Sequence, residues 1–380
     1  MKPLENITVL EFCQYMSGPS SALRLADLGA RVIKIERPVT GENGRQLSIK
    51  NNFLDDSSLL FHTINRNKES FTADLKSEEG IRKIKRLIRH ADVLIHNFRP
   101  GVMEKLQLDY ENAKAINPKI IYGVITGYGN KGPWKNKPGQ DLLIQSISGL
   151  TWLSGNKNDP PVPFGLSVAD YLCGTHLVQG ILASLIKRNK TKAGSLVEVN
   201  LLSSLIDLQF EVITTFLNND LQQQERALNG NGHAYLAAPY GIYKTRNGHI
   251  VIAMTDLKHL GNILNVELIN GSIDSFTHRD EIMAKLQQHL LQNDAAHWIS
   301  LLENAGVWCA EVLDYKQFTE QEGYKITEMD QTISLSENIR YQTTRCPIRF
   351  DGEKYFSFRP APAAGQHTAQ IEEEFGLNTH

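Results

Sequence analysis

Residues 7–36 predict two strands of one parallel sheet joined by a helix. Residues 7–12 and 31–36 are short runs rich in apolar and β-branched residues, which is typical of strands buried on both faces. Between them, residues 19–28 form an apolar helical pattern that begins at Pro19 and ends before Gly29. We therefore expect the chain to open with a βαβ unit of a doubly wound, Rossmann-like α/β domain.

The turn after the first strand argues against a dinucleotide cofactor. It reads C-Q-Y-M-S-G-P and holds one glycine, where the fingerprint G-x-G-x-x-G needs three. Glu36 ends the second strand, at the place of the ribose-binding acid in dinucleotide folds, but Arg37 follows it directly. A guanidinium suits a phosphate. Arg37 is thus either a phosphate ligand or an exposed charge at the end of a strand.

The later segments predict a large domain that continues this alternation and a smaller one. Strands are expected at 70–75, 91–98 and 119–125, with helices at 77–90 and 110–116. Further on, Asn247-Gly248 between two alternating runs predicts a hairpin, and three helical segments follow it. We expect a large Rossmann-like domain (1–217 plus 330–380), a linker (218–238) and a smaller α+β domain (239–329).

Composition excludes several classes of partner. The 380 residues carry 40 Lys and Arg against 42 Asp and Glu, so nothing favours nucleic acid or an anionic membrane. No run reaches the roughly 18 apolar residues of a membrane span. The four scattered cysteines predict reduced thiols in a cytoplasmic protein, and none of the histidines has metal-ligand spacing. We expect no membrane association and no metal site.

Asp170 lies in the first turn of a long apolar helix predicted for residues 168–187. Unpaired backbone amides and the helix dipole favour a charged carboxylate there, so we expect a low pKa and a carboxylate that can act as a nucleophile. The alternative is that Asp170 only stabilises the helix end. Small residues nearby, Gly165, Ala169 and Gly174, leave room for a substrate.

Four segments together resemble the family III CoA-transferases, the group that contains formyl-CoA transferases, carnitine CoA-transferases and 2-methylacyl-CoA racemases. They read G-P-x-x-x-x-x-L-A-D-L-G-A-x-V-I-K-I-E-x-P from Gly18, N-F-R-P-G from Asn97, G-Y-G-x-x-G-P-x-x-x-x-P-G-x-D from Gly127, and D-x-x-x-G-x-x-L-x-x-G-I-L-A-S-L from Asp170. The tail resembles the family's P-x-L-G-x-H-T, with Ala364 in place of Leu.

The resemblance implies acyl-CoA and carboxylic acid substrates, with Asp170 as the catalytic residue. It also implies an interlocked homodimer, in which each chain threads through the opening between the domains of the other. The residues it implies for CoA binding are Tyr15, Met16, Ser17, Arg37, Leu75, Lys76, Asn97, Phe98, Arg99, Lys105 and Tyr128. Gly139, Gln140 and Asp141 are implied for the oxyanion or the substrate.

The sequence is compatible with three functions. In a transferase, the carboxylate attacks the thioester and CoA passes to another acid through aspartyl anhydride and aspartyl-CoA intermediates. A racemase needs two proton-transfer groups, commonly a His where this chain has Gln140 and an Asp that matches Asp170. The absence of that His favours transfer, although Asp256 could stand in for the Glu of a G-A-L-E stretch by which racemases resemble one another. A silent CoA-binding protein is the third. Residues 229–233 fit either a linker or a lid over the site.

Overall fold

The computed structural model describes residues 2–268 and 274–378, which separate into two compact units. The sheet unit comprises Met1–Ile144, Ser167–Asp207 and Thr327–His380, and the second unit comprises Gln145–Leu166 and Leu208–Ile326. The expected division differs in that residues 145–166 and 208–217 group with the second unit. Hydrogen bonds from Arg226 to the carbonyls of Ser154 and Pro160 hold the first of these segments there.

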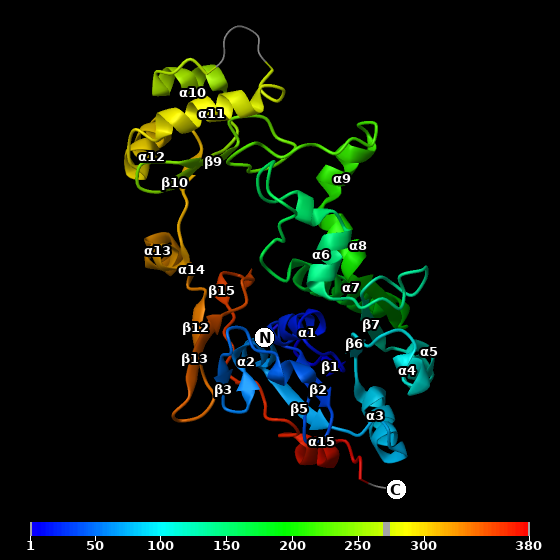
Figure 1. The fold of residues 1–380 in the computed structure, drawn as a ribbon. Coiled ribbons are helices and arrows are strands. Elements are labelled where there is room, and N and C mark those ends of the chain that lie inside the picture. Colours follow the sequence, from blue (N-terminus) through cyan, green and yellow to red (C-terminus); the bar gives the residue numbers. More distant parts are fainter. Residues whose placement is uncertain (1, 269–273, 379–380) are drawn as a thin grey trace. The chain divides into compact units, whose positions relative to one another are not determined.

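Six parallel strands form the centre of the sheet unit, in the order β5-β2-β1-β6-β7-β8 (Figure 1). They are β1 (Thr8–Glu11), β2 (Arg31–Glu36), β5 (Lys68–Thr72), β6 (Val93–His96), β7 (Ile121–Thr126) and β8 (Ser195–Asn200). Every neighbouring pair is parallel. All residues of β6 and β7 are buried, as expected of strands covered on both faces. The doubly wound α/β prediction is confirmed.

Helices cover both faces of this sheet. One core cluster joins Leu10, Leu94 and Tyr122 to buried residues of α3 (Glu78–His90), α5 (Tyr110–Ile116) and α15 (Thr368–Glu374). Gly123 faces the other way, toward Leu177 and Ile181 of α7 (Val168–Thr191). Helix α1 (Ser17–Asp27) packs against α7. Asp170 therefore lies where the predicted helix places it, in the first turn of α7.

The remaining elements of the sheet unit are short. They are η1 (Asn43–Gln46), β3 (Phe53–Leu54), β4 (Ser57–Ser58), α2 (Leu59–Asn65), α4 (Val102–Lys105), β12 (Asp330–Ser334), β13 (Arg340–Thr344), β14 (Arg349–Phe350) and β15 (Glu353–Lys354). The tail is fixed to the sheet edge, because Thr368 Oγ1 accepts a hydrogen bond from the Thr72 amide and Glu374 pairs with Arg31.

The second unit is built on a three-stranded antiparallel sheet in the order β11-β10-β9. Its strands are β9 (Gly241–Lys244), β10 (His249–Ile252) and β11 (Cys309–Glu311), and its core helices are α10 (Leu257–Leu264), α11 (Arg279–Leu290) and α12 (Ala295–Asn304). The predicted Asn247-Gly248 hairpin joins β9 to β10. Shorter helices are η2 (Leu150–Trp152), α13 (Tyr315–Glu320) and α14 (Glu322–Thr327).

Several predicted helix boundaries were wrong. Helix α7 ends at Thr191 and not at residue 187. Residues 201–217 form two helices, α8 (Leu201–Leu208) and α9 (Phe210–Leu217), because Gln209 leaves helical geometry (ψ 17°) and its buried side chain donates to Ser148 O. Helix α1 begins at Ser17, two residues before Pro19. Helix α6 (Asp141–Ile147) starts in the sheet unit.

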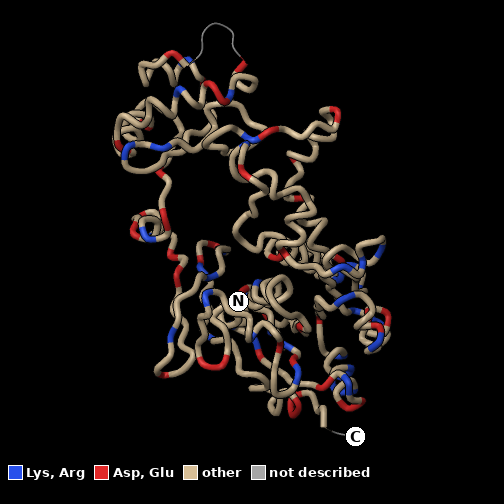
Figure 2. The backbone as a smooth tube through the Cα atoms, in the orientation of Figure 1, with Lys and Arg blue, Asp and Glu red and all other residues tan. Residues whose placement is uncertain are grey.

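Charge is distributed over the chain without a dominant sign. Lys and Arg positions are interspersed with Asp and Glu positions along the tube of Figure 2, in keeping with the net charge of −2. Across residues 2–268 and 274–378, we find no helix with the length and apolar character needed to cross a bilayer.

Candidate active site

The loops after β1 and β6 meet at the carboxyl edge of the sheet. Strand β1 lies between β2 and β6, so the winding direction reverses between β1 and β6, and in open α/β sheets ligands bind outside the strand ends at such a point. Asn97, directly after β6, joins the two loops. Its side chain accepts a hydrogen bond from the Gln14 amide (2.9 Å) and donates to the Gln14 carbonyl (2.7 Å).

Tyr15 in the β1–α1 loop adopts an unusual backbone conformation. Its φ is 65°, in the left-handed region that non-glycine residues rarely occupy. The Tyr15 amide donates to Glu42 Oε2 (2.9 Å), and the Asn43 side chain donates to the Tyr15 hydroxyl (3.1 Å). The segment after β2 therefore holds the first turn in place. Met16 and Ser17 follow at the start of α1.

Arg37 is exposed and hydrogen-bonds within its own loop, to Gly41 O and Asn43 Oδ1. It is thus linked through Asn43 to Tyr15. Arg99, in the loop after β6, is also exposed. Because both guanidiniums reach solvent, they remain candidates for phosphate contact.

Lys76 and Lys105 line one cavity of about 780 Å³ beside α3 and α4. Six of its lining residues are basic and one is acidic; they are Lys76, Arg82, Lys85, Arg86, Arg89 and Lys105, with Glu78. Leu75 also lines the cavity. Both Leu75 and Phe98 pack against the core cluster that includes Leu94 and Tyr122. The structure thus brings together three predicted residues, Leu75, Lys76 and Lys105, in a pocket that favours anions.

Asp170 lies close to the start of α1. The Ser17 side chain hydrogen-bonds with its carboxylate. Helices α1 and α7 approach closely here, since a Cβ on Gly174 would lie 2.6 Å from Ser17 O and 2.9 Å from Ser20 Oγ. Gly174 is therefore needed for the close approach that brings Ser17 to Asp170.

The predicted low pKa of Asp170 was wrong. Burial, and to a lesser extent the neighbouring charge of Asp141, raise the pKa of Asp170 to about 6, although the hydrogen bond from Ser17 opposes both effects. Desolvation and a like charge thus outweigh the helix dipole on which the prediction relied. Asp170 is still mostly ionised at pH 7, but it titrates close to neutrality.

Asp141 caps α7 from outside that helix. Its Oδ1 accepts hydrogen bonds from the amides of Ala169 (2.7 Å) and Asp170 (3.1 Å), whereas Ser167, the adjoining residue, makes no side-chain cap. The same carboxylate satisfies two amides of the first turn and places a negative charge beside Asp170. Asp141 was predicted as an oxyanion or substrate residue, and its capping role was not, because that role depends on a contact across 28 residues.

A close backbone contact positions Asp141. A Cβ on Gly127 would lie 2.8 Å from Gly139 Cα, and a Cβ on Gly139 would lie 2.6 Å from Gly127 Cα, so neither position accepts a larger residue without movement. Gly139, Gln140 and Asp141 follow one another into α6. The Tyr128 hydroxyl donates to Pro138 O (3.2 Å), within the same glycine-rich segment.

Asp256, the possible substitute for the Glu of the racemase stretch, is the N-cap of α10. Its Oδ1 accepts a hydrogen bond from the His259 amide at 2.7 Å. Among residues 2–268 and 274–378, no three His, Cys, Asp or Glu side chains are grouped as a metal would require.

Known proteins resemble this chain over most of its length. Residues 4–368 match the family model described as CoA-transferase family III. Succinyl-CoA:glutarate CoA-transferase of Homo sapiens is 30% identical over 98% of this chain and 86% of its own length. Formyl-CoA:oxalate CoA-transferase of Shigella sonnei is 28% identical over 99% of this chain and 96% of its own.

Solved structures of similar sequence also superpose on this chain. The crystal structure of a CAIB/BAIF family protein from Brucella suis superposes with a TM-score of 0.83 at 29% identity, covering 98% of this chain and 99% of that one. Rv3272 of Mycobacterium tuberculosis, in its orthorhombic crystal form, gives the same TM-score at 28% identity, with 98% and 99% covered. This chain belongs to the family III CoA-transferases.

Proposed function

We propose that Asp170 carries the acyl group during CoA transfer. The observation that supports this most is the half-buried Asp170 carboxylate at the start of α7, hydrogen-bonded to Ser17 and ionised at neutral pH. Such a carboxylate is poorly solvated and therefore more nucleophilic than one in water. The named relatives transfer CoA between carboxylic acids, among them succinate, glutarate and oxalate.

The steps balance without a metal or an external base. Asp170 attacks the thioester carbonyl, giving an acyl-aspartyl anhydride and the CoA thiolate. The thiolate attacks the aspartyl carbonyl, which forms aspartyl-CoA and releases the donor carboxylate. The acceptor carboxylate attacks aspartyl-CoA, and the thiolate then attacks the acceptor acyl carbonyl of this new anhydride. The products are a new acyl-CoA and free Asp170.

The oxyanion of each tetrahedral intermediate needs hydrogen-bond donors. The amides of Ala169 and Asp170 are already bonded to Asp141, so the helix start is poorly suited to this role. We assign the role to the amides of Gly139 and Gln140, which directly precede α6.

CoA itself is proposed to bind along the carboxyl edge of the sheet. The cavity lined by Lys76 and Lys105 would take phosphate groups, with Arg37 and Arg99 as further cations at the loop ends. Tyr15, Met16, Ser17 and Asn97 belong to the two loops joined at Gln14, which suits contact with the thiol-bearing arm. Leu75, Phe98 and Tyr128 complete the proposed set.

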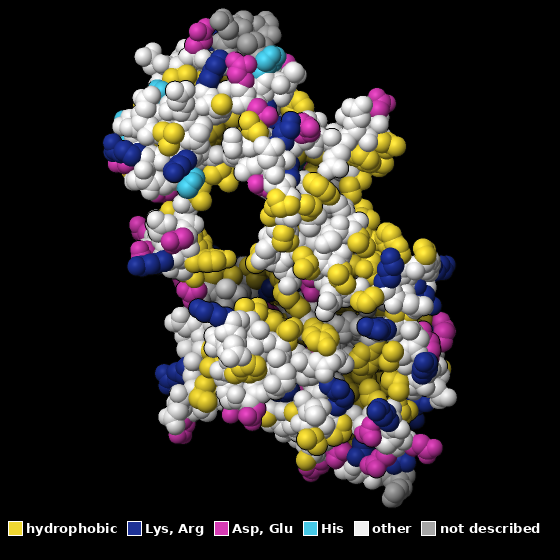
Figure 3. Space-filling model, in the orientation of Figure 1, with side chains coloured by type: hydrophobic (Ala, Val, Ile, Leu, Met, Phe, Trp, Pro, Cys, Tyr) yellow, Lys and Arg dark blue, Asp and Glu magenta, His cyan; other side chains and the backbone are white. Residues whose placement is uncertain are grey.

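The homodimer also remains a proposal. Helix α9 has no buried residue, although Phe210, Ile213, Phe216 and Leu217 give it an apolar composition, and Phe210 is 67% exposed. Figure 3 shows hydrophobic side chains gathered around this helix. A second copy of the chain would bury this surface, as the resemblance to interlocked family members implies.

A racemase is the second candidate, and two observations disfavour it. Gln140 cannot accept a proton, and Asp256 is engaged in capping α10. Incubation of an acyl-CoA in deuterated water without an acceptor acid would reveal racemase chemistry as exchange of the α-proton. We expect no exchange under conditions in which an added acid receives CoA.

Substitution of Asp170 tests the proposal. We expect Asp170→Asn to lower kcat by at least about 10³-fold while CoA still binds, because the amide keeps the shape but cannot attack the thioester. Succinyl-CoA and acetyl-CoA, each paired with glutarate and oxalate, are a suitable donor and acceptor panel. Asp294→Asn, at the N-cap of α12 in the second unit, is the matched control and should retain activity. Full turnover by Asp170→Asn would refute the assignment.

A further inference from the structure

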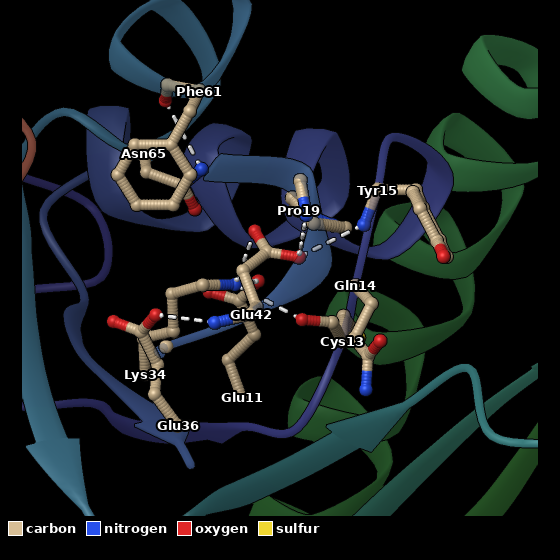
Figure 4. Close-up of polar contacts among 12 residues, drawn as sticks. Glu11, Cys13, Gln14, Tyr15, Pro19, Lys34, Glu36, Glu42, Phe61 and Asn65 are labelled. Carbon is tan, nitrogen blue, oxygen red and sulfur yellow. Dashed lines mark hydrogen bonds and ion pairs between the residues drawn. The ribbon is translucent and has the colours of Figure 1, made fainter. Parts of the chain in front are cut away.

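Four buried charged side chains form a cluster beside the β1–α1 loop (Figure 4). Lys34 pairs with Glu11 and Glu42, both at 3.1 Å, and Lys68 pairs with Glu11 at 2.9 Å. The cluster holds two positive and two negative groups. The pKa of Lys34 is raised, because the carboxylates of Glu11 and Glu42 outweigh the opposing effect of burial.

The cluster contacts the backbone of the loop and of the first turn of α1. Lys34 Nζ donates to Cys13 O (3.0 Å), Lys68 Nζ donates to Pro19 O (2.9 Å), and Glu42 Oε2 accepts from the Tyr15 amide (2.9 Å). Charged side chains therefore bond at three points along residues 13–19. This segment carries Tyr15, Met16 and Ser17, and Ser17 reaches Asp170.

Stability alone is a weak reason for such a cluster. Removing two lysines and two carboxylates from water is costly, and apolar side chains of similar size are often at least as stabilising. The conformation of Tyr15 supplies a stronger reason. A tyrosine at φ 65° is held against its own preference, and such a conformation persists only when its surroundings over-determine it.

We propose that Glu42 is a positioning residue for the acyl-CoA site, which fixes the β1–α1 loop by accepting the Tyr15 amide while Lys34 holds its carboxylate. The inference rests on the proposed function. Asn43, next in sequence, acts with Glu42, because its side chain donates to the Gln14 side chain (3.0 Å) and the Tyr15 hydroxyl (3.1 Å). The G-E-N-G-R segment from Gly41 is thus a clamp on the loop.

Three variants test the clamp through the calorimetric Kd for CoA and the KM and kcat for transfer. Glu42→Ala loses the acceptor for the Tyr15 amide, and we expect its Kd and KM to rise at least about tenfold, with a smaller change in kcat. Glu42→Gln keeps a side-chain oxygen for that amide and should recover part of the affinity. Asn43 is exposed, so Asn43→Ala should fold normally and raise Kd by about threefold.

A buried charge at the other end of α1 supplies the control. Asp27 is 3% exposed, pairs with Arg66 and ends α1, whereas the loop precedes that helix. We therefore expect Asp27→Asn to lower the Tm of the protein without changing its Kd for CoA. The inference is overturned if Glu42→Ala and Asn43→Ala bind CoA like the wild type, or if Asp27→Asn weakens binding as much as they do. A wild-type protein that does not bind CoA would instead contradict the proposed function, and the inference with it.

Discussion

At the scale of single residues, the chemistry of Asp170 is set by its neighbours more than by its helix. The first-turn position was evident from the sequence, because the apolar helical pattern of residues 168–187 begins two residues before Asp170. Its pKa was not, since burial against α1 and the charge of Asp141 come from segments distant in sequence. Local rules describe a helix end in water, and this helix end is half-buried.

The Asp141→Asn variant distinguishes the capping hydrogen bonds of Asp141 from the effect of its negative charge on Asp170. Asparagine keeps an oxygen for the amides of Ala169 and Asp170 but removes the like charge, so we expect the pKa of Asp170 to fall. Because the attacking form is ionised, the acid limb of the kcat/KM–pH profile should move to lower pH. An unshifted limb would contradict the role of Asp141.

Asp141→Ala is the companion variant. It loses the cap as well as the charge, and we expect a further stability loss of about 1 kcal/mol by chemical denaturation. If Asp141→Asn is destabilised as much as Asp141→Ala, the hydrogen bonds from Asp141 to the α7 amides do not contribute to the stability of the protein.

At the scale of elements, the approach of α1 to α7 builds the site. Gly174→Ala would place a methyl group 2.6 Å from Ser17 O, which is backbone and cannot rotate away. We expect a stability loss of about 1–3 kcal/mol and a loss of transfer activity, because Ser17 moves from Asp170.

Gly180→Ala, on the same helix, is the control for this prediction. Its new methyl group would meet the Val197 side chain on β8, away from the first turn of α7. Stability should fall here too, but turnover per folded molecule should be retained. Equal loss of turnover in both variants would show that helix packing in general, and not the contact with Ser17, supports activity.

The elements themselves were largely predictable, and the reasons are local. Buried parallel strands such as β7 are continuous apolar runs, and Ser77 caps α3 as its position before two glutamates predicts. The break at Gln209 was not predictable, because the hydrogen bond that accompanies it goes to Ser148, 61 residues away in sequence. The capping of α7 by Asp141 was likewise not predicted, because it also depends on a residue that is distant in sequence.

At the scale of the whole molecule, the exposed apolar face of α9 bears on assembly. Phe210→Asp would place a charge on this face, and we expect the dimer proposed here to dissociate in sedimentation velocity. Val39 is 96% exposed, so Val39→Asp is the control and should leave the sedimentation coefficient unchanged. A monomeric wild-type protein, or a dimer indifferent to Phe210→Asp, would contradict this assignment.

The proposed reaction requires Asp170 to become covalently acylated during turnover. The direct measurement is hydroxylamine trapping with acyl-CoA and acceptor acid present, followed by mass spectrometry of the peptides. Both proposed intermediates expose an activated aspartyl carbonyl, so we predict a hydroxamate on Asp170 that forms only when acyl-CoA is supplied. An active enzyme that never carries this label, or carries it on another residue, would show that Asp170 is not the nucleophile.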